Sequence, residues 1–128
     1  MKTITSEWVD KAEGDWGSAG REVVVQINPN YDLVCFLAQQ CAEKYLKACL
    51  QEEAIMPPKT HDLEKLMDLL LPTQPFWKTL LPALDQLSEY AASFRYPGQA
   101  ADEKEAQAAV EYCRQVREAA RRSFGLSV

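Results

Sequence analysis

Residues Phe36-Leu-Ala-Gln-Gln-Cys-Ala-Glu-Lys-Tyr-Leu-Lys-Ala-Cys-Leu50 form an uninterrupted stretch that contains neither proline nor glycine. The turn signal Asn28-Pro29-Asn30 precedes it, so we expect one long helix from about Tyr31 to Glu53. Apolar residues cover about half of its circumference, namely Leu33, Phe36, Leu37, Cys41, Leu46, Ala48 and Leu50. We therefore expect this helix to lie at the centre of the molecule.

The segment before it also has helical periodicity, from about Thr5 to Ile27. Its apolar residues recur at steps of three and four: Trp8, Ala12, Trp16, Ala19, Val23 and Ile27. Gly14, Gly17 and Gly20 lower the helix propensity of the segment. Packing must stabilise such a helix, and close approach of a neighbouring helix is one reason to expect glycine there.

Proline-marked connections divide the rest of the chain. An extended connector, Ile55 to Lys59, is followed by a short helix from about His61 to Leu71, with Thr60 as N-cap and Asp62 in the first turn. After a loose turn around Phe76 to Thr79, a fourth helix has Pro82 near its first turn or at a kink. It ends at Arg95-Tyr96-Pro97-Gly98, and the last helix runs from about Asp102 to Phe124. The predicted fold is a single all-α domain, residues 1–128, an up-and-down bundle of about five helices.

Composition excludes several classes of function. The net charge of -5 argues against broad DNA or RNA binding. The start of the chain has no apolar signal region and no stretch is apolar enough to span a membrane, so we expect a soluble, cytoplasmic protein. Cysteines occur without a C-x-x-C pair and are interpreted as small buried residues, with no metal or cofactor expected: Cys35, Cys41, Cys49 and Cys113. The arginines of the last helix, Arg114, Arg117, Arg121 and Arg122, are interpreted as a solvated face near a helix end.

Three polar residues of the central helix, Gln40, Lys44 and Lys47, share one face at positions i, i+4 and i+7. Two ammonium groups and a carboxamide in this arrangement can bind a phosphate and a base edge. The alternative is a solvated face with a surface pair between Glu43 and Lys47, a pair that contributes about 0.3 to 0.5 kcal/mol. The spacing alone leaves both interpretations open.

Two other places have functional potential. His61 is the single histidine, and either caps or packs a loop or contacts a ligand. Arg95 stands beside Tyr96, where a guanidinium can bind phosphate while the ring packs on a base. A buried Arg95 that ties two helices together is the alternative.

Several segments together resemble the HEPN domain, the higher eukaryotes and prokaryotes nucleotide-binding domain. They are the run from Phe36 to Leu50, Lys59-Thr-His-Asp-Leu63 with Leu66, and Tyr90 with Arg95-Tyr96-Pro97; Trp8, Asp15-Trp16 and the alanine-rich last helix extend the similarity over nearly the whole chain. The resemblance implies a four-helix HEPN-like core plus a short helix. It also implies a homodimer, a minimal nucleotidyltransferase as partner, and toxin-antitoxin pairs among its relatives. Exposed leucines between Leu69 and Leu81 would supply an apolar patch for association.

Many members of the family are metal-independent ribonucleases with an Arg followed four to six residues later by His. Arg95 matches that arginine, but Ala100, Ala101 and Asp102 stand where the histidine belongs. His61 is then the one histidine that could act as the acid or base in RNA cleavage. We therefore expect a non-catalytic module that binds a nucleotide or RNA through Gln40, Lys44, Lys47, His61, Arg95 and Tyr96. The alternatives are a ribonuclease toxin that uses Arg95 and His61, and a purely structural partner subunit.

Overall fold

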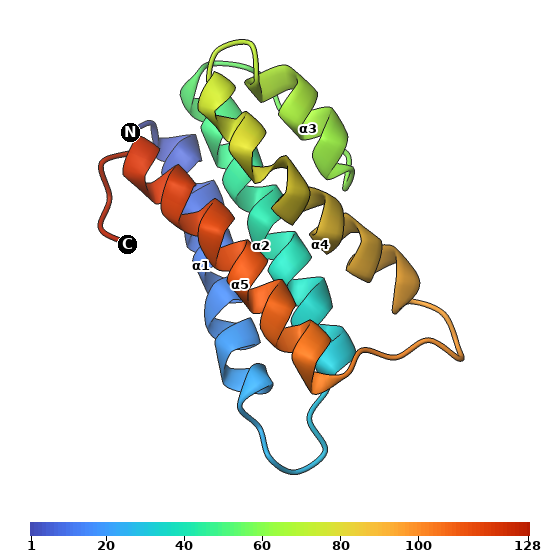
Figure 1. The fold of residues 1–128 in the computed structure, drawn as a ribbon. Helices are drawn as coiled ribbons and strands as arrows, with labels where there is room; N and C mark the ends of the chain where they lie inside the picture. Colours follow the sequence, from blue (N-terminus) through green and yellow to red (C-terminus); the bar gives the residue numbers. More distant parts are fainter.

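The computed structural model describes residues 1–128 as an all-α bundle without strands. Its elements are α1 (Thr3–Val23), α2 (Tyr31–Glu52), α3 (Leu63–Leu70), the 3-10 helix η1 (Pro75–Leu80), α4 (Leu81–Ser93) and α5 (Glu103–Ser123). Neighbouring long helices run up and down, and α1 begins at the end of the bundle where α5 finishes (Figure 1). None of the helices combines the length and the apolar composition that a membrane span requires.

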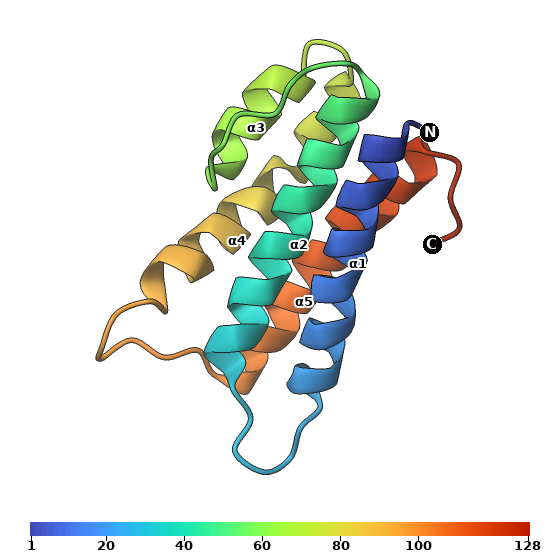
Figure 2. The same cartoon turned by 180° about the vertical axis from the view of Figure 1, so that it is seen from behind.

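Helix α2 lies at the centre, as its sequence predicts. It contacts α1, α3, α4 and α5, and the view from behind shows it between α1 and the α3–α4 pair (Figure 2). The Asn30 side chain begins the helix by accepting a hydrogen bond from the amide of Leu33, at 3.0 Å. Asp32 in the first turn accepts another from the amide of Ala101, at 2.7 Å, and so attaches the segment before α5 to the start of α2.

The burial of α2 differs from the predicted apolar face. Phe36 is 50% exposed and Leu33 is 36% exposed, whereas Gln39, Glu43 and Lys47 are buried. Further along, Tyr45, Leu46 and Leu50 are fully buried, and α2 as a whole contacts four other helices. Residue type therefore assigns the wrong exposure to Phe36.

Helix α1 is shorter than predicted at its end. It finishes at Val23, and Ile27 lies beyond it with 83% of its surface exposed. Close approach of a neighbouring helix does not explain the glycines. A Cβ at Gly14 or Gly20 would meet nothing within 4 Å, and one at Gly17 would meet only the guanidinium of Arg21.

The remaining boundaries follow local chemistry. Asp62, not Thr60, caps α3 by accepting hydrogen bonds from the amides of Glu64 and Lys65. The predicted loose turn forms η1, and Pro82 occupies the first turn of α4, as predicted. Asp102 and Glu105 form a capping box at the start of α5.

One expectation about the cysteines and leucines is confirmed and the other is wrong. The cysteines are free and buried, as expected. The predicted leucine patch is not present as such, because Leu70 is buried and Leu71, Leu80 and Leu81 pack against the core; only Leu69, at 41%, is exposed.

Candidate functional site

An open groove of about 400 Å³ lies between α2, the end of α4 and the end of the segment that leads into α3. Three of the predicted site residues, Gln40, His61 and Arg95, line it together although they are far apart in the sequence. The other lining residues are Phe36, Gln39, Asp62, Ser88, Ala91 and Ala92. The groove thus combines one guanidinium, one imidazole, one carboxylate, one hydroxyl and two carboxamides with an exposed aromatic ring.

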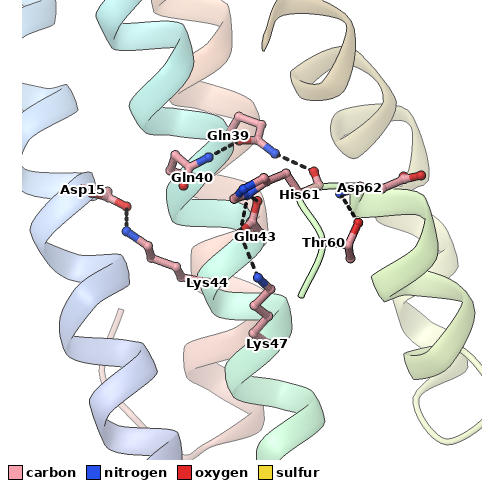
Figure 3. A network of polar contacts seen from close by, with 9 residues as sticks. All are labelled: Asp15, Gln39, Gln40, Glu43, Lys44, Lys47, Thr60, His61 and Asp62. Atoms are coloured by element: carbon pink, nitrogen blue, oxygen red, sulfur yellow. Dashed lines mark hydrogen bonds and ion pairs between the residues drawn. The ribbon is translucent and has the colours of Figure 1, made fainter. Parts of the chain in front are cut away.

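The ring of His61 is exposed and is hydrogen-bonded to the side chain of Glu43 on α2, as Figure 3 shows for the bond. Its Nδ1 lies 2.9 Å from Oε1 and 3.2 Å from Oε2 of Glu43. The histidine side chain is 82% exposed, and that of Glu43 is 3% exposed. Of the alternatives for His61, the helix cap is wrong, because Asp62 caps α3.

Lys47 neutralises the buried Glu43 carboxylate. Its Nζ donates a hydrogen bond to Oε2 of Glu43 at 3.0 Å, and its side chain is only 9% exposed. The same ammonium group lies 5.4 Å from the centroid of the Trp8 ring. The predicted pair between Glu43 and Lys47 does form, but it is buried, so its energetics are those of an interior ion pair.

One glutamine of α2 attaches the segment that carries His61, and a second glutamine is hydrogen-bonded to the first. Gln39 Nε2 donates a hydrogen bond to the backbone carbonyl of His61 at 3.1 Å, and Gln40 Nε2 donates to Oε1 of Gln39 at 2.9 Å. Figure 3 shows these contacts beside the bond between His61 and Glu43. His61 is therefore fixed both by its backbone and by its ring.

The polar strip of α2 does not form one binding surface. Lys44 turns toward α1, where its Nζ lies 2.6 Å from Oδ2 of Asp15 (Figure 3). Lys47 is buried beside Glu43, and neither lysine lines the groove. Only Gln40 of the predicted strip does so.

Arg95 follows directly after the C-cap of α4. It is exposed, and it has no salt bridge, so the alternative of a buried arginine that ties two helices is wrong. Its Cζ lies 5.7 Å from the ring centroid of Tyr96. Tyr96 is 62% exposed and does not line the groove.

Sequence reasoning did not name Phe36, Gln39 and Ser88, which line the groove, as site residues, nor Glu43, which supports His61. One signal was available for two of them. Gln39, Glu43 and Lys47 recur every four residues, which aligns three polar side chains on one face of α2. Their burial depends on the packing of neighbouring elements, which the sequence of α2 does not specify.

The arginines of α5 are not simply a solvated face. Arg114 pairs with Glu111 and Glu118, whereas Arg117 and Arg121 are largely buried against Glu13 of α1. Burial opposes ionisation of Glu13, but hydrogen bonds from Arg117 and Tyr45 outweigh it and lower the pKa of that carboxyl. Burial, together with the hydrogen bond to Glu13, raises the pKa of Tyr45.

Comparison with known proteins defines the class. The HEPN domain model matches residues 5–123, and the chain therefore belongs to the HEPN domain family. The fold is similar to the crystal structure of an archaeal HEPN homologue, with a TM-score of 0.67 and 22% sequence identity over 96% of this chain and 98% of that chain. No curated protein matches the sequence.

Proposed function

We propose that this domain binds a nucleotide, or the end of an RNA, in the groove and does so without cleaving it. The observation that carries the proposal is that Gln40, His61 and Arg95, from three separate segments, line one groove. The Arg95 guanidinium suits a phosphate because it offers several donors in a fixed plane. The half-exposed Phe36 ring provides a surface on which a base can stack, and Gln40 can both donate to and accept from a base edge.

Calorimetry with ATP, GTP, CTP and UTP tests this proposal. Arg95→Ala should weaken binding by about 1 to 3 kcal/mol, the range for a lost charge-assisted hydrogen bond. Arg21→Ala is the matched control, because Arg21 is an exposed arginine on α1 that lies outside the groove. A wild-type protein that releases no heat with any of these nucleotides would contradict the proposal.

A metal-independent ribonuclease is the second candidate, and one observation favours it. Arg95 and His61 line the same groove, and the buried carboxylate of Glu43 lies behind the histidine. A histidine near neutral pH can accept the proton of a ribose hydroxyl. Only one histidine is available, however, and cleavage also requires an acid for the leaving oxygen, so binding remains the leading proposal.

Induced expression in a host cell distinguishes these two candidates. Growth arrest that disappears with both Arg95→Ala and His61→Ala would favour the ribonuclease. Growth arrest that survives both substitutions, or normal growth of the wild type, would count against it.

Partners form a separate part of the proposal and rest on the family resemblance. We propose that the domain is a homodimer and acts with a minimal nucleotidyltransferase, in the manner of a two-component toxin-antitoxin pair. A monomer in sedimentation at micromolar concentration would contradict the first point. Co-purification with a nucleotidyltransferase in the absence of any nucleotide affinity would instead favour the purely structural subunit.

A further inference from the structure

The hydrogen bonding of His61 determines which of its ring nitrogens can meet a ligand. Nδ1 faces both oxygens of Glu43, at 2.9 and 3.2 Å, and Nε2 has no hydrogen-bond partner within the protein. The ring lines the groove and is 82% exposed. Nε2 is therefore the nitrogen that a molecule in the groove can reach.

The environment of Glu43 indicates which nitrogen carries the hydrogen. The side chain of Glu43 is only 3% exposed, and the Lys47 ammonium lies 3.0 Å from its Oε2, where it compensates the charge of a carboxylate. An ionised carboxylate only accepts hydrogen bonds. Nδ1 must then be the donor, which leaves Nε2 with a free lone pair whenever the imidazole is neutral.

We propose that Glu43, held by Lys47, is a positioning residue that fixes His61 with Nε2 as an acceptor, so that the groove selects ribonucleotides by accepting a hydrogen bond from the ribose 2'-hydroxyl. This inference rests on the proposed nucleotide binding and narrows it. Phosphate oxygens accept hydrogen bonds and do not complement a neutral Nε2, whereas the 2'-hydroxyl is a donor that deoxyribonucleotides lack. Arg95, in the same groove, is the complement for the phosphate.

Nitrogen NMR of the ring tests the positioning step without any ligand. His61 is the single histidine, so its two ring nitrogens give unambiguous signals. At a pH where the ring is neutral, the wild type should show a hydrogen on Nδ1, and Glu43→Gln, which preserves the size of the side chain, should shift the population toward the Nε2–H form. A wild-type ring with its hydrogen on Nε2 would overturn the inference, and this measurement requires no variant to fold.

Calorimetry with ATP and with 2'-deoxy-ATP tests the selection step. The wild type should prefer ATP by about twofold to tenfold, the value of one neutral hydrogen bond. His61→Ala should remove the preference while retaining binding, and Arg95→Ala should weaken both ligands equally. Equal wild-type affinities would overturn the ribose assignment and leave nucleotide binding intact. No heat from either ligand would overturn nucleotide binding and the ribose assignment together, and the NMR result would then concern the histidine alone.

Discussion

Arg117 of α5 donates two hydrogen bonds to the Glu13 carboxylate of α1, with Nε 2.8 Å from Oε2 and Nη2 2.7 Å from Oε1. This fork-shaped pairing joins the first helix of the chain to the last. Tyr45 of α2 also donates to Glu13, and Arg121 of α5 donates to the Tyr45 hydroxyl at 3.2 Å. Three helices thus converge on one carboxylate.

Glu13→Gln should lower the free energy of unfolding by about 1.5 to 3 kcal/mol at pH 7, because it removes the charged acceptor of these hydrogen bonds. Urea unfolding followed by circular dichroism measures the change. Glu7→Gln is the control, since Glu7 is exposed on the same helix and has no salt bridge. Equal stability of the two variants would show that the Glu13 contacts contribute nothing measurable.

The contribution of Glu13 to the free energy of unfolding should depend on pH. Its pKa is lowered from the usual 4.5 in the folded protein, so the unfolded chain binds a proton more readily. The stabilising contribution is complete above pH 4.5 and is lost as the pH falls through the folded value. The difference in unfolding free energy between the wild type and Glu13→Gln should therefore shrink below about pH 4.5. A difference that grows in acid would contradict this assignment.

Lys47→Ala should destabilise the fold by about 3 to 5 kcal/mol, because it leaves the Glu43 carboxylate buried without its cation. The double variant Glu43→Gln/Lys47→Met should recover much of the loss, since neither side chain then carries a charge. Urea unfolding of both proteins gives the comparison. If the double variant were less stable than Lys47→Ala, desolvation of the lone carboxylate would not be the cause.

Lys44→Ala should leave nucleotide affinity unchanged, because the Lys44 ammonium is paired with Asp15 and lies outside the groove. It should lower stability by about 1 kcal/mol or less. Calorimetry beside Arg95→Ala checks this point. A loss of affinity as large as that of Arg95→Ala would show that Lys44 does contribute to nucleotide binding.

The cysteines should resist alkylation in the native protein. Burial raises the pKa of Cys35 and of Cys49 to about 12, so almost no thiolate is present at pH 8. Iodoacetamide followed by mass spectrometry should label all four cysteines in urea and few in buffer. Rapid native labelling of Cys35 would show that the start of α2 opens readily.

Much of the fold follows from sequence because its signals are local. Asn30 and Asp102 are capping residues at the boundaries that the sequence indicates, and Pro82 occupies a first turn where its missing amide hydrogen is harmless. The predictions are wrong where the exposure of a side chain depends on a neighbouring helix. Phe36 is exposed and Lys47 is buried because α2 is enclosed unevenly by other elements, and residue type does not encode that enclosure.

In the candidate site too, residue identities can be predicted from the sequence, whereas their arrangement depends on how the helices pack. Gln40, His61 and Arg95 can be named from the sequence, yet only the packing of α2, α4 and the segment before α3 brings them to one groove. Glu43 was missed in that role because its position every fourth residue from Gln39 and Lys47 also fits a solvated face. Whether that face of α2 is covered depends on residues distant in the sequence. The contact between Glu43 and His61, for example, joins residues 18 positions apart.

The regular spacing of Gln39, Glu43 and Lys47 also determines where the chain tolerates a change in length. Residues added to the loop after Arg95 lengthen a surface connection and leave α2 untouched. One residue inserted between Gln39 and Glu43 would turn the second half of α2 by about 100° relative to the first. Gln39 and Glu43 would then face different directions. The backbone of His61 could no longer accept from Gln39 while its ring contacts Glu43. The helix would therefore persist, but His61 would no longer be fixed in the groove.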